Sequence, residues 1–193
     1  MNNFTIIAYY TKDTYYKDLA ESLTASCKKF NLDYIIQEIP NLGTWQKNTH
    51  YKPIFIHNML KKDVEAVVYV DVDAVFMENP LRFNAIQKDI AIPILDHVKH
   101  GKVKRGKELL SGTLYFKNTI YSKQLINKWC EECVENPNMW DQRVLEKIVS
   151  GFDYEILPDE YCYIFDYKYK QIGSPVITHY QASRRFRKTK SLA

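Results

Sequence analysis

Apolar and polar positions along the chain form alternating blocks that predict strands and helices in turn. Short apolar runs rich in β-branched residues are typical of strands, and apolar residues three or four positions apart are typical of helices. We predict strands at 4–10, 33–39, 66–70, 89–95, 109–116 and 175–179. We predict helices at 14–30, 120–135 and 139–150, and one more that begins at Pro53, because proline suits a first helical position.

Two connections in this pattern are long. Residues 40–50 contain Gly43 and are predicted to form a loop. Residues 96–108 are basic and contain two glycines, so we expect a mobile loop there. The alternation of strands with helices predicts an α/β fold with a mostly parallel central sheet flanked by helices.

The strand predicted at 66–70 is nearly continuous in apolar character, which is typical of a parallel strand buried on both faces. It leads directly into Asp71-Val72-Asp73. In open α/β sheets, ligands bind beyond the carboxyl ends of the strands. Two carboxylates so close together repel each other unless a cation neutralises them, and a hard divalent cation can do this while it holds a diphosphate. The motif therefore favours a site for a divalent cation and a nucleoside diphosphate.

The composition supports a folded domain with basic segments. The chain has 193 residues, of which 46% are hydrophobic, and this excludes a disordered chain. We assign residues 1–183 to one domain and 184–193 to a basic C-terminal tail; five cations lie in 184–190 and five more in 99–107. Such groups suit phosphate binding. A nucleic-acid-binding role is not predicted, because basic groups do not account for a buried strand that ends in two aspartates.

The sequence also bears on where the protein is found. No apolar stretch approaches the ~20 residues that span a bilayer, and the first residues lack the basic and apolar parts of a secretory signal. We therefore expect a cytoplasmic protein without a transmembrane segment and with reduced cysteines. Cys130 and Cys133 form a CxxC inside a predicted helix, and no second CxxC completes a zinc site, so we expect them to pack in the core.

Four short segments in a fixed order resemble a known family. The segment 69–76, which contains the two aspartates, is similar to the DXD segment of GT-A glycosyltransferases, including the nucleotide-diphospho-sugar transferases and the glycogenin-like and bacterial α-galactosyltransferase-like enzymes. The segments 110–118, 140–142 and 178–180 resemble the strand under the sugar, the Asp-Gln pair and the late histidine of that family. The resemblance covers about residues 4–187 and implies a single-domain GT-A (Rossmann-like) fold.

The resemblance implies a metal site and a nucleotide site. Asp71 and Asp73 would bind the metal together with His179, and Mn²⁺ suits an imidazole ligand better than Mg²⁺ does. The end of the first strand would hold the nucleobase and ribose through Tyr9, Tyr10 and Thr11, with Trp45 on the same side. Lys52 and, from the tail, Arg184 and Arg185 are the candidates for phosphate contacts. These nucleotide-binding and metal-binding candidates are Tyr9, Tyr10, Thr11, Lys52, Asp71, Val72, Asp73, Ser111, Gly112, His179, Arg184 and Arg185.

The resemblance also assigns the sugar side. Asp141 would bind hydroxyls of the sugar or the acceptor, and Gln142 would lie near the anomeric carbon. Ser111 and Gly112 would form the floor under the sugar. Asp96 and His97, which follow a predicted strand, are weaker candidates beside the same pocket.

The implied reaction is transfer of a sugar from a nucleoside diphosphate sugar, with UDP favoured, to a hydroxyl of a glycan, glycoprotein or glycolipid. The resemblance favours retention at the anomeric centre, and Gln142 cannot act as a general base. An inverting mechanism would need a base such as Asp141 or Asp96 within reach of the acceptor.

Two other enzyme classes stay open on sequence grounds. The segment 68–75 also resembles the first motif of haloacid-dehalogenase-like phosphatases, in which Asp71 would be the nucleophile. Those enzymes usually carry this motif on their first strand. A sugar nucleotidyltransferase is the third possibility, but it would require a glycine-rich loop after the first strand, and residues 9–13 contain no glycine.

Overall fold

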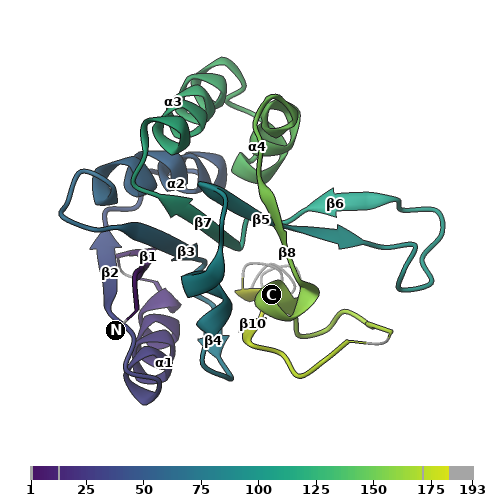
Figure 1. Cartoon of the computed structure of the whole chain (residues 1–193). Helices are drawn as coiled ribbons and strands as arrows, with labels where there is room; N and C mark the ends of the chain where they lie inside the picture. Colours follow the sequence, from purple (N-terminus) through teal and green to yellow (C-terminus); the bar gives the residue numbers. More distant parts are fainter. Residues whose placement is uncertain (1, 13, 171, 183–193) are drawn as a thin grey trace, which may run out of the picture.

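A computed structural model describes residues 2–12, 14–170 and 172–182 of the chain. Strands and α-helices alternate through residues 5–70, and strands joined by loops and one 3-10 helix follow up to residue 117 (Figure 1). The elements are β1 (Thr5–Thr11), α1 (Tyr16–Lys29), β2 (Tyr34–Ile39), α2 (Trp45–Met59), β3 (Ala66–Val70), β4 (Ala74–Phe76), η1 (Leu81–Ala85), β5 (Ile90–Asp96), β6 (Lys107–Leu109), β7 (Thr113–Lys117), α3 (Ile120–Glu135), α4 (Asp141–Ile148), η2 (Val149–Gly151), β8 (Glu155–Leu157), η3 (Asp159–Cys162), β9 (Tyr163–Ile164) and β10 (Ile177–His179).

The central sheet has the strand order β2-β1-β3-β7-β5-β6, and β8 pairs with β5. Strands β1, β2 and β3 are parallel to one another, as is β8 to β5, whereas β7 is antiparallel to both of its neighbours. The predicted α/β class with a central sheet between helices is confirmed, and the sheet is mixed. Because β1 and β3 are adjacent and parallel, the residues that follow them meet at one edge of the sheet.

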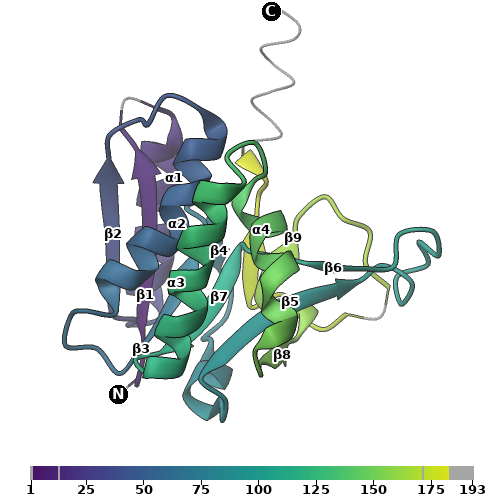
Figure 2. The same ribbon diagram turned by 90° about the horizontal axis from the view of Figure 1, so that it is seen from above.

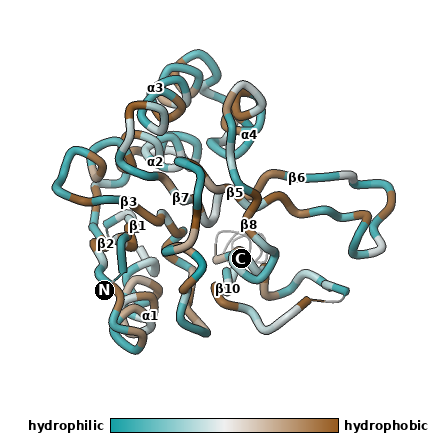
Figure 3. Tube along the Cα trace, in the orientation of Figure 1, coloured by the Kyte–Doolittle hydropathy of each residue, from teal (hydrophilic) through white to brown (hydrophobic). Residues whose placement is uncertain are grey.

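Alternate residues of the central strands face two separate helical layers. Ile7 and Tyr69 pack in a cluster with α2, α3 and α4, whereas Ile6 and Val68 pack in a cluster with α1 and β4. Figure 1 shows α1 on one side of the sheet and α2, α3 and α4 on the other, and Figure 2 gives the same layers from above. Hydrophobic colouring concentrates in the strands in Figure 3, which agrees with burial of β3 at every position.

A second, small sheet is attached beside the first. It has the order β4-β10-β9, and β10 runs antiparallel to β4 with Ala74 opposite His179. This pairing brings a residue from near the end of the chain back to the segment that follows β3. The late histidine and the two aspartates therefore come together through the second sheet.

The predicted start of the second helix is wrong. Helix α2 begins at Trp45, eight residues before Pro53, and the proline lies inside the helix. The cap is Thr44, whose side-chain oxygen accepts a hydrogen bond from the backbone N–H of Lys47 at 3.2 Å. Threonine is a favoured N-cap residue, and in this helix Thr44 rather than Pro53 marks the start. The predicted loop at 40–50 is correspondingly shorter.

The predicted loop at 96–108 connects two paired strands, and its mobility stays a prediction. It forms a hairpin that projects from the body of the molecule between β5 and β6 (Figure 2). The backbone N–H of His97 donates to the carbonyl of Gly106 at 2.9 Å, and β6 pairs with β5 up to Asp96. Gly101 and Gly106 have φ angles of 81° and 65°, a left-handed conformation that glycine adopts without strain.

Within the described part of the chain, no helix combines the length and the apolar character that crossing a membrane requires. The cysteines are free thiols: Cys27, Cys133 and Cys162 are buried and Cys130 is half-buried. Cys130 and Cys133 lie on α3, as predicted. Burial raises the pKa of the Cys133 thiol to about 12, so this side chain packs as a small neutral group.

Candidate functional site

A pocket of about 420 Å³ lies at the edge of the sheet where β1 and β3 end. Segments from distant parts of the sequence line it, including the starts of α2 and α4, the turn before β7 and the end of β10. Among the predicted site residues, the following line this pocket: Tyr9, Tyr10, Thr11, Trp45, Lys52, Asp71, Val72, Asp73, Ser111, Gly112, Asp141, Gln142 and His179. The structure thus brings together residues that are up to 170 positions apart in the sequence, since 179 minus 9 is 170.

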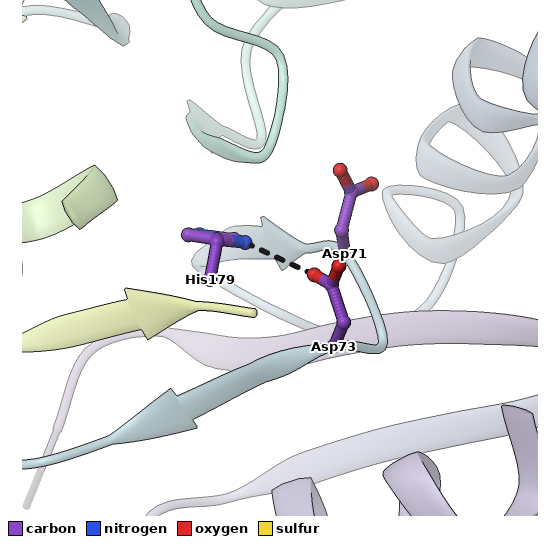
Figure 4. A group of neighbouring side chains, drawn as sticks. All are labelled: Asp71, Asp73 and His179. Carbon is purple, nitrogen blue, oxygen red and sulfur yellow. Dashed lines mark hydrogen bonds and ion pairs between the residues drawn. The ribbon is translucent and has the colours of Figure 1, made fainter. Parts of the chain in front are cut away.

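Two carboxylates and an imidazole converge on one side of the pocket. Among the described residues, Asp71, Asp73 and His179 offer ligand atoms that all lie within 4.8 Å of one another (Figure 4). Nδ1 of His179 lies 3.4 Å from Oδ1 of Asp73. The side chain of Asp71 is 41% exposed, so its carboxylate is open to the pocket. We call these three residues the acidic triad.

The surroundings orient the acidic triad. Nε2 of His179 lies 2.9 Å from the hydroxyl of Thr113, which leaves Nδ1 facing Asp73. The backbone N–H of Ala182 donates to Oδ2 of Asp73 at 2.8 Å. Burial by itself raises the pKa of Asp73, but the hydrogen bond with His179 and the contact with Ala182 outweigh this and lower it. The Asp73 carboxyl group is therefore held in its charged form.

Close approach to the triad requires a glycine in the neighbouring turn. A Cβ atom added to Gly112 would lie 3.1 Å from Cε1 and 3.3 Å from Nδ1 of His179, and 3.4 Å from Oδ2 of Asp71. The carbonyl of Gly112 also accepts a hydrogen bond from the backbone N–H of Asp71 at 2.8 Å. The Ser111-Gly112 turn therefore packs directly against the triad.

A buried lysine lies at the centre of a second group, which we call the lysine network. Nζ of Lys52 lies 2.8 Å from Oδ2 of Asp141 and 3.1 Å from Oδ1 of Asp71. It also donates to the backbone carbonyl and to the hydroxyl of Ser111, at 3.1 and 3.0 Å. The Ser111 hydroxyl in turn donates to Oδ2 of Asp141 at 2.9 Å, and Trp129 Nε1 donates to the Asp141 carbonyl at 3.0 Å.

The charge on Lys52 is stabilised although the residue is only 3% exposed. Burial alone lowers the pKa of its ammonium group, but the carboxylates of Asp141 and Asp71 outweigh this effect and raise it. Lys52 lies in the middle of α2 rather than at the start of a helix. Its ammonium group lies between the carboxylates of Asp71 and Asp141 at the pocket wall.

The family relationship follows from the whole chain. The model of the nucleotide-diphospho-sugar transferase family matches residues 1–184. The chain belongs to this family. It is therefore a glycosyltransferase, and the predicted GT-A type fold is confirmed. None of the curated proteins matches the sequence.

Solved glycosyltransferases share this fold. A glycosyltransferase involved in the glycosylation of the major capsid of PBCV-1 is similar to the chain with a TM-score of 0.70 and 13% identity, over 98% of both chains. The glycosyltransferase GlyE of Streptococcus pneumoniae TIGR4 is similar with a TM-score of 0.66 and 15% identity. That match covers 94% of this chain and 55% of GlyE. At these identities the similarity establishes the fold.

Membership of the transferase family sets aside the phosphatase and nucleotidyltransferase alternatives.

Two tyrosines line the side of the pocket predicted for the nucleoside, and they differ in burial. Tyr9 is 9% exposed, its ring packs against Tyr51 and Phe55, and its hydroxyl donates to the carbonyl of Asn48 at 2.6 Å. Tyr10 is half-buried and also lines the pocket.

Some residues in or beside the pocket were not predicted from the sequence. Tyr69 donates its hydroxyl to Oδ1 of Asp71 at 3.0 Å, Thr113 contacts His179, and Glu108 lines the pocket. Tyr69 and Thr113 lie inside two of the four segments that resemble the family, 69–76 and 110–118. Their proximity to the site could therefore have been predicted from the sequence. Glu108 follows a run of basic residues in a presumed loop, where an acidic residue suggests only charge pairing with its neighbours.

Other predicted candidates are placed differently. Arg184 and Arg185 lie outside the described residues. Asp96 is at the end of β5, and its Oδ1 accepts hydrogen bonds from the backbone N–H groups of Val98 and Lys99 within the hairpin. His97 is itself a residue of the hairpin, and its buried side chain contacts Glu108.

Proposed function

We propose that the chain transfers a sugar from a UDP-sugar to a hydroxyl of a glycan, glycoprotein or glycolipid acceptor, with retention of the anomeric configuration and with Mn²⁺ at the acidic triad. The observation that carries the proposal is the convergence of Asp71, Asp73 and His179 in the pocket of a nucleotide-diphospho-sugar transferase. Uridine as the base rests on the family resemblance of the sequence motifs.

The donor set fits a divalent cation. Carboxylate oxygens suit Mn²⁺ and Mg²⁺, and the imidazole nitrogen favours Mn²⁺ of the two. Metal-binding histidines are commonly oriented by a hydrogen bond at the ring nitrogen that does not bind the metal. Thr113 makes such a contact with Nε2 of His179, and the backbone N–H of Ala182 donates to Asp73. When bound, the cation supplies Lewis-acid stabilisation of the departing diphosphate.

The chain's own side chains favour retention. An inverting enzyme requires a carboxylate that is free to accept a proton from the acceptor. Oδ2 of Asp141 is held by both Lys52 and Ser111, and the side chain is 5% exposed. Gln142 has no basic group. These contacts make Asp141 a poor general base.

Thermal denaturation with nucleotides tests the proposal. A ligand that binds only the native state stabilises it by about 2.7 kcal/mol at 100 times its Kd. We expect UDP to raise the Tm in Mn²⁺ and to lose this effect in EDTA, and GDP, CDP and ADP to act more weakly. Asp73→Asn and His179→Ala should abolish the shift.

Asp63→Asn is the matched control, because Asp63 is exposed and lies outside the pocket. It should respond to UDP as the native chain does. An equal UDP shift in EDTA, or a full shift in both triad variants, would rule out the metal site. Retention is checked separately, by NMR analysis of the anomeric configuration of the first-formed product.

A further inference from the structure

Glu108 connects the projecting hairpin to the part of the pocket where Gln142 lies. Its carboxylate accepts a hydrogen bond at each oxygen. Nε2 of Gln142 donates to Oε1 at 3.2 Å, and Nε2 of His97 lies 2.8 Å from Oε2. Arg105 lies 3.5 Å from Oε2 but is 56% exposed, and such a surface pair contributes little. The two buried or half-buried contacts therefore define the position of the carboxylate.

These contacts continue at both ends into a single chain of hydrogen bonds. The hydroxyl of Tyr167 lies 2.8 Å from Nδ1 of His97, whose side chain is 2% exposed. At the other end, Oε1 of Gln142 accepts from the backbone N–H of Ser111 at 3.3 Å. The order of the chain is Tyr167, His97, Glu108, Gln142, Ser111.

The direction of each hydrogen bond is consistent along this chain. An ionised carboxylate only accepts, so His97 presents an N–H at Nε2, and in the neutral tautomer with this N–H its Nδ1 accepts from the Tyr167 hydroxyl. For the same reason Gln142 turns its NH₂ group to Glu108 and its oxygen to the N–H of Ser111. Glu108 thus selects one of the two orientations of the Gln142 amide.

We propose that Glu108 is a positioning residue that holds the Gln142 amide in one orientation beside the donor sugar, with His97 and Tyr167 holding Glu108 in turn. This inference rests on the proposed function, in which Gln142 faces the sugar. Both oxygens of Glu108 are engaged, so it acts through Gln142 and not as a base. The hairpin base and the segment that contains Tyr167, which are far apart in the sequence, are thereby coupled to the reaction.

A double-mutant cycle tests the proposal. The measured quantity is release of UDP in Mn²⁺, with water as acceptor, from the UDP-sugar that gives the largest thermal shift. Because small displacements of a positioned group reduce rates by up to about 100-fold, we expect Glu108→Ala to lower kcat about 10- to 100-fold. Gln142→Ala should lower kcat by a similar factor, and the double variant should be no slower than Gln142→Ala alone. The KM for the donor should change little.

Two further variants separate positioning from a general structural role. Glu108→Gln retains a carbonyl oxygen that can accept from Gln142, so it should lose less activity than Glu108→Ala. Glu21→Ala, an exposed carboxylate on α1, is the matched control and should behave as the native chain does.

Independent, multiplying losses in the double variant would overturn the inference, as would native kcat in Glu108→Ala. If Gln142→Ala is fully active, the inference fails, while metal-dependent UDP binding still reports separately on the proposed function. Should Glu108→Ala not fold, the cycle is repeated with Tyr167→Phe, which removes only the hydroxyl. If Tyr167→Phe lowers kcat in the native protein but not in the Gln142→Ala variant, the result supports the proposed chain of hydrogen bonds. If Tyr167→Phe has no effect, or lowers kcat equally in both proteins, the inference is overturned.

Discussion

The acidic triad and the lysine network share one pocket but balance their charges differently. Asp71, Asp73 and His179 place two carboxylates around one imidazole, and Asp71 is 41% exposed. In the lysine network, by contrast, Lys52 and Asp141 have opposite charges and side chains that are 4% and 5% exposed. The group with surplus negative charge opens to the pocket, whereas the Lys52–Asp141 ion pair is buried. The comparison indicates which group recruits a ligand and which one supports the site.

Asp71 belongs to both groups. One of its oxygens is 3.1 Å from Lys52 and also accepts from Tyr69, and the residue shares the triad with Asp73. Lys52 therefore fixes the triad's most exposed carboxylate from behind. If this division of roles is correct, changes in the network should act first on stability and changes near the triad should act first on metal binding.

The largest effect is expected for Lys52→Met. It leaves Asp141, which is 3% exposed, without its cation, and breaking a buried ion pair in this way costs about 3–5 kcal/mol. We expect this decrease in the free energy of unfolding, measured by urea denaturation. Adding Asp141→Asn should recover part of it, because the stranded charge is then removed.

Lys47→Met is the control for this change, since Lys47 is exposed on the same helix. Its free energy of unfolding should stay within about 0.5 kcal/mol of the native value. A loss for Lys52→Met no larger than that of the control would show that the network does not support the fold.

The second-largest effect is expected for Gly112→Ala, and the property that should change is metal binding. The added methyl group would lie 3.1 Å from Cε1 and 3.3 Å from Nδ1 of His179, so the imidazole ring must shift, and it would touch Oδ2 of Asp71 at 3.4 Å. Displacing the groups that orient metal ligands weakens binding about 10-fold or more. We expect about a 10-fold higher Mn²⁺ concentration at half-maximal activity.

Gly151→Ala is the matched control, because a Cβ atom there meets nothing within 4 Å. Unchanged Mn²⁺ dependence in Gly112→Ala, together with a normal melting temperature, would contradict the role assigned to the triad.

The smallest effect is expected for Ser111→Ala. It removes the hydroxyl between Lys52 and Asp141 but leaves their 2.8 Å ion pair and the backbone carbonyl contact in place. The hydroxyl accepts from Lys52 and donates to Asp141, and the loss of these two hydrogen bonds, at about 1 kcal/mol each, costs about 2 kcal/mol in the free energy of unfolding. Urea denaturation beside Ser150→Ala, an exposed serine, checks the value. A loss as large as that of Lys52→Met would mean that the hydroxyl, and not the ion pair, dominates the network.

Much of the fold could be predicted because local rules and tertiary structure agree there. The buried run at 66–70 forms β3, and the aspartates directly after it line the pocket. Prediction was wrong at α2, where the proline rule placed the helix start at Pro53 although Thr44 caps the helix. Lys52 consequently lies in the middle of the helix, and it lines the pocket.

The sequence by itself determined the alternation of strands and helices, the position of the two aspartates at a strand end and the family motifs, because periodicity and short motifs are local properties. Only the tertiary structure decided which charges are paired. The antiparallel pairing of β10 with β4 places His179 beside Asp73, α2 places Lys52 between two aspartates, and the hairpin places Glu108 against Gln142. Each of these contacts joins residues at least 19 positions apart (71 minus 52, the closest pair), and packing alone fixes such distances.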